Sequence, residues 1–271
     1  MPKDRKRKIV YVGFAFSHHK NTYAGYNRIK EYLDYDYVID IQQYFDTPDV
    51  RSRLLRRIIN IWHSILCKCL DLNCLTLGVV KLIYLAIFKG SLIIHFVHGE
   101  NFFPIKLLNY IHRNNRFVFT FHQPFSWFEQ NKFFENRKQL CDGIILMSNN
   151  EISRFVEASG CKSTVFIPHG ITTDFFNCAP VVGGERIVLT VGSWLRDFSF
   201  ACSVYNQILA VDPSVKIVVV SNRDNAHYFA GDNRISFFHN ISNEQLIDLY
   251  QKCSVLFLPL SRFTANNTLF E

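Results

Sequence analysis

The fold is decided by one stretch of this 271-residue chain, which reads ISNEQLIDLY at Ile241–Tyr250, SVLFLPL at Ser254–Leu260 and TANNTLFE at Thr264–Glu271. The pattern predicts a capped helix, a buried strand that ends at Pro259, a polar turn and the start of a second helix. The free N–H groups at a helix N-terminus after a parallel strand bind anions. The stretch therefore predicts a ligand site at the start of the last helix.

The same alternation of strand and helix runs through the whole chain. Apolar, β-branched segments alternate with longer amphipathic segments, which is typical of a parallel sheet covered by helices. We expect strands at 8–16, 35–41, 92–98, 116–122, 142–148, 163–168, 186–193, 216–222, 234–239 and 254–260. We expect helices at 23–33, 52–69, 75–88, 103–114, 149–159, 199–210 and 243–252.

A Pro- and Gly-containing segment at 176–184 divides these elements into two series. The charge changes at the same place: residues 1–180 contain 23 Lys and Arg against 15 Asp and Glu, and residues 181–271 contain 7 against 8. The expected fold is α/β, with one Rossmann-like domain at 1–177 and a second, incomplete one at 185–271.

The basic charge of the first domain favours partners that carry phosphate, such as an anionic lipid or a nucleotide. A solvated basic surface is the alternative. A nucleic-acid partner is not expected, because no recognition motif is present and aromatic residues do not alternate regularly with the basic ones.

The eight cysteines form no Cys-x-x-Cys pair, which argues against a zinc or thioredoxin-like site. Free cysteines and the charged residues that follow Met1 predict a reducing, cytoplasmic compartment. No cluster of metal ligands follows the predicted strands, so neither a metal nor another cofactor is expected.

The segment Arg51–Leu70 predicts a helix with an apolar face and a basic face. The apolar face contains Leu55, Ile58, Ile59, Trp62, Ile65, Leu66 and Cys69, and the other contains Arg53, Arg57, Asn60, Ser64 and Lys68. Such a helix can lie on an anionic membrane surface, or it can pack on the sheet like an ordinary surface helix. No uncharged run reaches the length that a membrane-spanning helix requires.

Candidate site residues of the first domain follow its predicted strands, where open parallel sheets bind ligands. The loop Ser17–Tyr26 after the first strand could hold a phosphate or a hydroxylated acceptor through His18, His19, Tyr23 and Gly25. His122 ends the fourth strand just before Pro124, a position that favours a ligand contact over core packing.

His98 and Glu100, after the third strand, are an imidazole and a carboxylate that could perform acid–base chemistry. They could equally form hydrogen bonds with neighbouring loops.

In the second domain, Gly192 ends a strand and Arg196 follows it before a helix, where a guanidinium can bind a diphosphate. A surface ion pair between Arg196 and Asp197 is the alternative. Asn266, Asn267 and Glu271 open the last predicted helix, where a carboxylate can accept hydrogen bonds from ribose hydroxyls beside free backbone N–H groups. A carboxylate that only interacts with the helix dipole is the other interpretation.

The segment Ser163–Phe176 (STVFIPHGITTDFF) resembles the signature of glycosyltransferase family 4, which comprises retaining enzymes with the two-domain GT-B fold. Segments 141–148, 188–192 and 246–259 are similar to other parts of that family. The resemblance implies that Gly192 and Arg196 lie near the donor diphosphate, that Glu271 lies near the ribose, and that His122 lies beside the transferred sugar.

Two positions depart from the family pattern. Phe263 replaces the first glutamate of its paired-glutamate motif, and Ser193 and Phe198 replace the usual basic pair of the donor loop. The family also continues beyond the residue that corresponds to Glu271.

The resemblance implies transfer of a sugar from a nucleotide sugar to a glycan or lipid-linked acceptor in polysaccharide biosynthesis, in the cytoplasm or at the inner membrane face. The alternative is a non-catalytic protein of the same fold that binds a nucleotide or a glycan.

Overall fold

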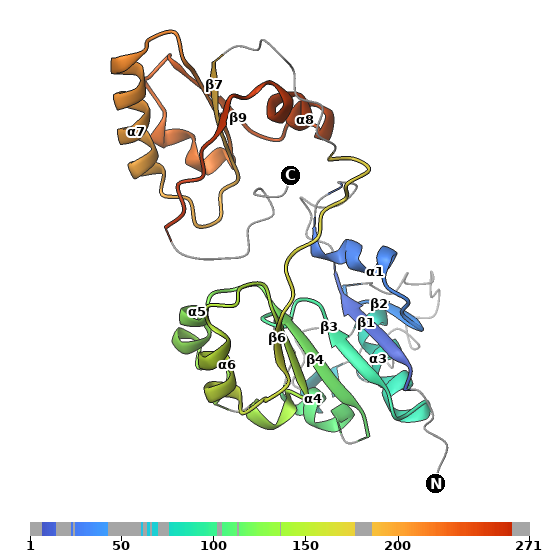
Figure 1. Cartoon of the computed structure of the whole chain (residues 1–271). Coiled ribbons are helices and arrows are strands. Elements are labelled where there is room, and N and C mark those ends of the chain that lie inside the picture. The colour runs from blue at the N-terminus through green and yellow to red at the C-terminus, as the bar shows by residue number, and fades with distance from the viewer. Residues whose placement is uncertain are drawn as a thin grey trace. The chain divides into compact units, whose positions relative to one another are not determined.

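The computed structural model describes residues 7–14, 23, 25–42, 61, 64–65, 67–69, 76–101, 105–112, 114–135, 137–176 and 186–261. Two compact units are present. The first comprises Met1–Lys20 and Gly25–Pro168, and the second comprises Asn21–Ala24 and His169–Glu271. Each unit is built on its own parallel sheet (Figure 1).

The first unit contains six strands in the order β2-β1-β3-β4-β5-β6, and every neighbouring pair is parallel. The strands are β1 (Ile9–Gly13), β2 (Tyr37–Asp40), β3 (Ile93–Phe96), β4 (Arg116–Phe121), β5 (Gly143–Leu146) and β6 (Thr164–Phe166). The helices are η2 (Tyr26–Arg28), α1 (Ile29–Tyr32), α3 (Leu77–Phe88), α4 (Ile105–His112), α5 (Phe125–Gln130), η3 (Lys138–Leu140) and α6 (Ile152–Ser159).

Phenylalanine rings form much of the core of this unit. Seven of them, from β4, α5, α6 and the turn after α5, contact one another at centroid distances of 4.7–6.0 Å: Phe117, Phe119, Phe121, Phe128, Phe133, Phe134 and Phe155. Edge-to-face and offset packing of this kind stabilises an aromatic core beyond the burial of its area. These rings are part of the large hydrophobic core of the first unit.

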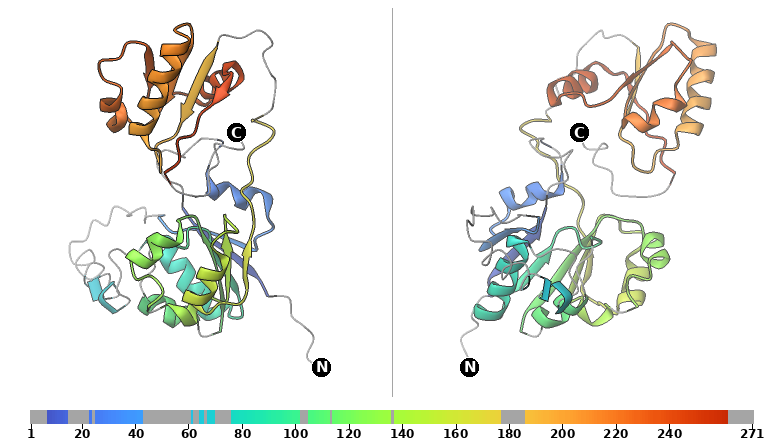
Figure 2. Two further views of the ribbon diagram at one scale, coloured as in Figure 1. Left: turned by 60° about the vertical axis from the view of Figure 1, so that its left-hand side comes forward. Right: turned by 180° about the vertical axis from the view of Figure 1, so that it is seen from behind.

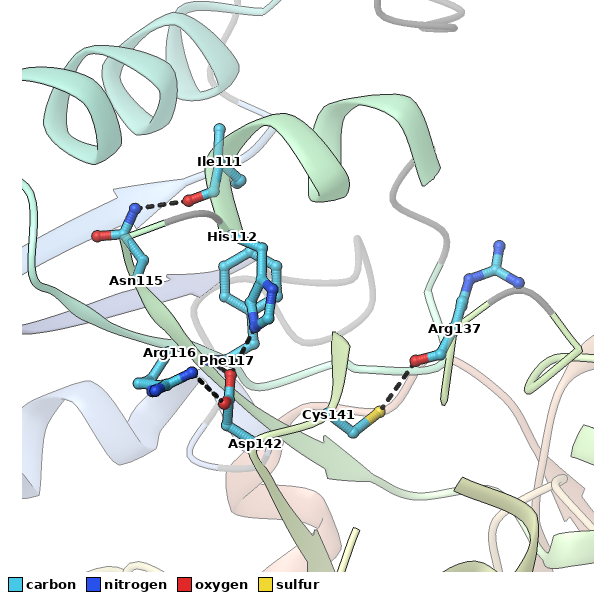
Figure 3. A network of polar contacts seen from close by, with 8 residues as sticks. All are labelled: Ile111, His112, Asn115, Arg116, Phe117, Arg137, Cys141 and Asp142. Atoms are coloured by element: carbon cyan, nitrogen blue, oxygen red, sulfur yellow. Dashed lines mark hydrogen bonds and ion pairs between the residues drawn. The ribbon is translucent and has the colours of Figure 1, made fainter. Parts of the chain in front are cut away.

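A polar network joins the amino ends of β4 and β5 (Figure 3). The Asp142 carboxylate accepts hydrogen bonds from the Phe117 N–H at 2.9 Å and the Arg116 guanidinium at 3.0 Å, and it bonds His112 Nε2 at 2.7 Å. The nearby Asn115 side chain accepts from the Leu92 N–H and donates to the Ile111 and Ala86 carbonyls. These contacts connect the end of α4 to the amino ends of the strands.

The second unit contains four parallel strands in the order β10-β7-β8-β9. Its elements are β7 (Ile187–Val191), α7 (Phe198–Val211), β8 (Lys216–Val220), η4 (Arg223–Tyr228), β9 (Ile235–Phe238), α8 (Asn243–Lys252) and β10 (Val255–Leu256). Alternate residues of β7 enter different clusters, Val188 with α7 residues and Leu189 with α8 residues. The two helices therefore cover opposite faces of the sheet, as both views of Figure 2 show.

Side-chain caps explain where the longer helices begin. Ser242 and Gln245 form a complete capping box at the start of α8, and Asp197 accepts the Phe200 N–H at the start of α7. Thr76 caps α3 by accepting the Val79 N–H. Among the described helices, none is both long and apolar enough to cross a membrane.

All ten predicted strands are present with shorter bounds, and α8 agrees with its predicted range. The strand expected at 254–260 is the largest difference. Its ladder comprises only Val255 and Leu256, on the edge of the sheet, and Val255 is exposed. The short helix α5 is a further difference, since no helix was predicted there.

Candidate functional site

The first candidate site lies where the strand order of the first unit reverses. From β1 the chain passes to β2 on one side, and β3 then pairs with the other side of β1. Parallel sheets bind ligands beyond the carboxyl ends of the strands at such a switch point. Phe14 follows β1 here, His98 and Glu100 follow β3, and His122 follows β4.

Glu100 and His122 form a buried pair at this edge. His122 Nδ1 lies 3.1 Å from Glu100 Oε1, and the His122 backbone N–H donates to Oε2 of the same carboxylate at 3.4 Å. Both residues are only 8% exposed. A carboxylate can only accept hydrogen bonds. The contact therefore favours the His122 tautomer that carries its proton on Nδ1. The predicted partner of Glu100 was His98, and the structure pairs it with His122 instead.

Three further rings, those of Phe14, Tyr26 and His98, lie at this pair, and we call them together with His122 the ring cluster. Tyr26 stacks on His122 at a centroid distance of 3.7 Å, and Phe14 stacks on His98 at 4.5 Å. Burial and the nearby charge of Glu100 raise the pKa of Tyr26, so its phenol stays protonated and can donate a hydrogen bond. Phe14 and Tyr26 were not predicted as site residues, although Tyr26 ends the loop that was.

A glycine positions the two residues that follow β3. A Cβ on Gly99 would lie 2.7 Å from the Phe121 ring and 2.9 Å from Phe119 Cβ. The Gly99 N–H donates to the Thr120 carbonyl at 2.8 Å. Only glycine therefore lets the chain turn against β4 closely enough to place Glu100 beside His122.

His95, on β3, is the centre of a second set of polar contacts within the sheet. His95 Nε2 lies 2.7 Å from Thr120 Oγ1, and its Nδ1 lies 2.7 Å from the Tyr35 hydroxyl. Burial, and then the nearby His122, lower the pKa of His95 to about 4, so this imidazole is neutral at neutral pH. Sequence reasoning missed His95 because a histidine inside an apolar strand resembles a core residue.

The predicted loop after β1 is divided between the two units. Gly25, with φ of 114°, precedes η2 in the first unit, where this backbone conformation favours glycine. Tyr23 belongs to the second unit, where its ring stacks on Phe175 at 3.7 Å and its carbonyl accepts from the Thr172 hydroxyl at 3.1 Å. His18 and His19 lie outside the described residues.

The second candidate site is the loop between β7 and α7. Gly192 has φ of 96°, and Arg196 donates to the Val191 carbonyl from Nε at 3.1 Å and from Nη2 at 2.9 Å. A third bond joins its Nη1 to the Trp194 carbonyl at 3.2 Å. Burial lowers the pKa of Arg196, although a guanidinium remains charged at any physiological pH.

Asp197, the alternative partner of Arg196, accepts the Phe200 N–H and caps α7. Arg196 therefore organises its own loop, which lies at the switch point of the second sheet between β7 and β10. The chain after β10 closes onto the loop: Asp197 N–H donates to the Pro259 carbonyl at 2.7 Å, and an antiparallel bridge joins Arg196 and Leu260.

Short polar side chains connect this loop to the end of β8. Ser193 Oγ lies 3.0 Å from Ser221 Oγ and accepts the Asn222 N–H at 3.0 Å. Ser221 Oγ also accepts from the Asn225 amide at 3.0 Å. None of these residues was predicted as part of a site, and Ser193 was noted only as a departure from a basic position.

Three predicted donor-site residues, Asn266, Asn267 and Glu271, lie outside the described residues, as does most of the predicted helix Arg51–Leu70. Within that helix, Ile65 and Cys69 are exposed, whereas Cys67 packs against the core of the first unit. Among the described residues, no group of three or more His, Cys, Asp or Glu side chains could hold a metal ion.

No protein-family model matches the sequence, and no curated protein matches it. Solved structures are similar. HepE from Anabaena, in complex with UDP and glucose, has a TM-score of 0.57 and 12% identity over 97% of this chain and 77% of HepE. TarM has a TM-score of 0.52 and 10% identity over 72% of this chain and 42% of TarM, so the match spans less than half of that protein.

These likenesses confirm the predicted fold class, an α/β chain with Rossmann-like domains of the GT-B type.

Proposed function

We propose that the protein transfers a sugar from a nucleotide sugar to a glycan or lipid-linked acceptor. The observation that carries this proposal is the buried Glu100–His122 pair, stacked under Tyr26 at the switch point of the first sheet. The shared fold with HepE, which binds UDP and glucose, supports a nucleotide-sugar donor.

The proposed roles follow from the contacts. Glu100 holds the His122 ring, whose Nε2 would orient a sugar hydroxyl, and Tyr26 restricts the rotation of that ring. In the reaction, the bond between the sugar C1 and the phosphate oxygen breaks and a bond from C1 to the acceptor oxygen forms. The acceptor proton passes to the departing diphosphate, whose charge Arg196 and the N–H groups of its loop would stabilise.

The family resemblance further favours retention of the anomeric configuration, a role in polysaccharide biosynthesis, and donor contacts from Asn266, Asn267 and Glu271. The direct test is to incubate the protein with a panel of nucleotide sugars and glycan acceptors and to measure the released nucleoside diphosphate. Binding of a nucleotide sugar with no product in any combination would favour the non-catalytic alternative. NMR of the anomeric proton of a product would distinguish retention from inversion.

Substitution of Arg196 by alanine is expected to weaken nucleoside diphosphate binding about tenfold or more. A hydrogen bond to a charged group contributes roughly 1.5–3 kcal/mol, and the variant also loses the contacts that shape the loop. Isothermal titration calorimetry measures the change. Arg186→Ala is the matched control, because Arg186 is exposed and pairs with Asp212 on the surface. Equal affinity of Arg196→Ala and the wild type would remove Arg196 from the site.

Membrane association is a second part of the proposal. Helix α3 has one apolar face in the core and a second that is exposed, which comprises Val80, Tyr84, Ile87 and Phe88. Lys81 and Lys89 are exposed beside this face. Apolar and aromatic side chains flanked by lysines are typical of helices that lie at a membrane surface. With the basic predicted helix Arg51–Leu70, this face supports association with an anionic membrane.

The protein is therefore expected to sediment with anionic liposomes at low salt and much less with neutral ones, because basic residues each contribute about 1 kcal/mol near an anionic surface. Changing Arg53, Arg56 and Arg57 to glutamate should abolish sedimentation. The same change at Arg186, Lys216 and Arg223 of the second unit alters the net charge equally and should have little effect. Equally weak sedimentation with both lipids would contradict a membrane role.

A further inference from the structure

Trp194 is an exposed aromatic residue within the loop of the proposed diphosphate site. It lies in the loop between β7 and α7, two residues after Gly192 and two before Arg196, and 58% of the residue is exposed. Its indole has no hydrogen bond, ion pair or ring contact with any residue that the structure describes. Trp127 of α5, by comparison, contacts the rings of Phe128 and Phe133.

The backbone that carries this indole is held tightly on both sides. The Trp194 carbonyl accepts from Arg196, and the next carbonyl, of Leu195, accepts from the Ser261 N–H at 3.0 Å and the Ser261 hydroxyl at 3.2 Å. Ser193, on the other side, is bonded to Ser221 and Asn222.

Leu195 adopts φ of 55°, a left-handed conformation that is unfavourable for a leucine. Such a conformation persists only where surrounding contacts enforce it, and it often marks a functional site. Single exposed hydrophobic residues are common and need no explanation by themselves. What distinguishes Trp194 is that it is presented by a strained turn at a switch point, in which the carbonyls of Trp194 and Leu195 both accept hydrogen bonds.

The position also indicates what the indole can bind. A nucleotide sugar carries a ring on each side of its diphosphate, the base on one side and the sugar on the other. A ligand whose diphosphate lies at Gly192 and Arg196 therefore brings one of these rings within reach of Trp194. Stacking on an indole that is already held in place costs little conformational entropy, because a tryptophan has few rotatable bonds and this backbone is fixed.

We infer that Trp194 is a stacking platform for a ring of the nucleotide-sugar donor. This inference rests on the proposed function and adds a residue that contributes to the recognition of the donor. Stacking of one base on an aromatic side chain accounts for a change in affinity of about 5- to 150-fold when the side chain is replaced by alanine. We expect Trp194→Ala to weaken donor binding within that range.

The test combines calorimetry with tryptophan fluorescence on the full chain. UDP, ADP, GDP and dTDP, and the glucose derivative of each, are titrated into the wild type, Trp194→Ala, Trp194→Phe and the control Tyr110→Ala. Tyr110 is an exposed aromatic residue on α4 of the first unit. Ligand binding should change the emission of the wild type and of the control but not that of Trp194→Phe, which should retain more affinity than Trp194→Ala.

The ligands separate the two possible rings. If a nucleoside diphosphate alone changes the emission of the wild type and binds Trp194→Ala more weakly, the ring that stacks on Trp194 is the base. If both effects appear only with the glucose derivatives, the stacked ring is the sugar. If every ligand that binds the wild type also binds Trp194→Ala with equal affinity, and none produces a Trp194-dependent emission change, the inference is overturned and the proposed function is left intact. Failure of every ligand to bind the wild type would overturn both.

Discussion

Replacement of His122 by alanine is expected to lower turnover of the nucleotide sugar about 100-fold or more, while affinity for the nucleoside diphosphate changes little. Positioned acid–base and hydrogen-bonding groups typically contribute factors of 10² to 10⁴. In the structure His122 is oriented by Glu100 at 3.1 Å and covered by Tyr26, whereas the proposed diphosphate loop belongs to the other unit. A residue that contacts the reacting sugar should therefore affect kcat much more than nucleotide binding.

His112→Ala is the matched control for this experiment. His112 is also a histidine paired with a carboxylate, Asp142, but it lies at the amino ends of the strands. Its loss should lower stability without lowering the turnover of the folded protein. Glu100→Gln should fall between the wild type and His122→Ala, because an amide oxygen can still accept from Nδ1 but carries no charge. Normal turnover of His122→Ala with a lower Tm would show that His122 is structural.

The strands of both sheets could be predicted because their patterns are continuous. The sequences IVYVG of β1 and IVLTV of β7 are almost entirely apolar and β-branched or aromatic, as expected for strands buried on both faces. Helix α8 could be predicted with its bounds because Ser242 and Gln245 form a capping box. Helix α5 was missed because six residues after Pro124 are too few to show a helical period.

The partners of the candidate site residues could not be predicted, since they depend on the register between strands. His122 was recognised from its place at a strand end. Its bond to Glu100 follows from the pairing of Phe96 with Phe119 between β3 and β4, which brings the residues after both strands together. The spacing of residues in the sequence does not by itself predict which residues of two strands lie opposite each other. The stacking of Tyr26 also requires the turn that Gly25 starts after β1.

The role of Arg196 shows a different limit. A charged residue between a strand and a helix suggested a ligand contact or an ion pair with its neighbour. In the structure its guanidinium bonds the backbone carbonyls of Val191 and Trp194. Backbone carbonyls accept many of the side-chain hydrogen bonds in proteins, but every residue has one, so the sequence does not indicate which carbonyl a side chain contacts. A charged residue between a strand and a helix can thus shape its own loop through backbone contacts.

Replacement of Asp142 by alanine is expected to destabilise the first unit by roughly 2–4 kcal/mol, the largest loss of stability that we predict for a single polar side chain. The carboxylate, only 23% exposed, accepts from the Phe117 N–H, bonds His112 and pairs with Arg116 (Figure 3). Its removal leaves the N–H of a partly buried strand and an imidazole without their acceptor. Chemical denaturation monitored by circular dichroism would measure the change.

Two variants separate this explanation from a general effect of losing a surface charge. Asp142→Asn keeps the size of the side chain and one acceptor oxygen, so it should lose less stability than Asp142→Ala. Asp232→Ala removes a carboxylate that pairs with Arg234 on the surface of the second unit, and it should change stability much less. Because Asp142 lies at the amino ends of the strands and the ring cluster follows their carboxyl ends, the folded Asp142→Ala protein should keep normal turnover. Equal losses of stability in Asp142→Ala and Asp232→Ala would show that the network does not stabilise the sheet edge.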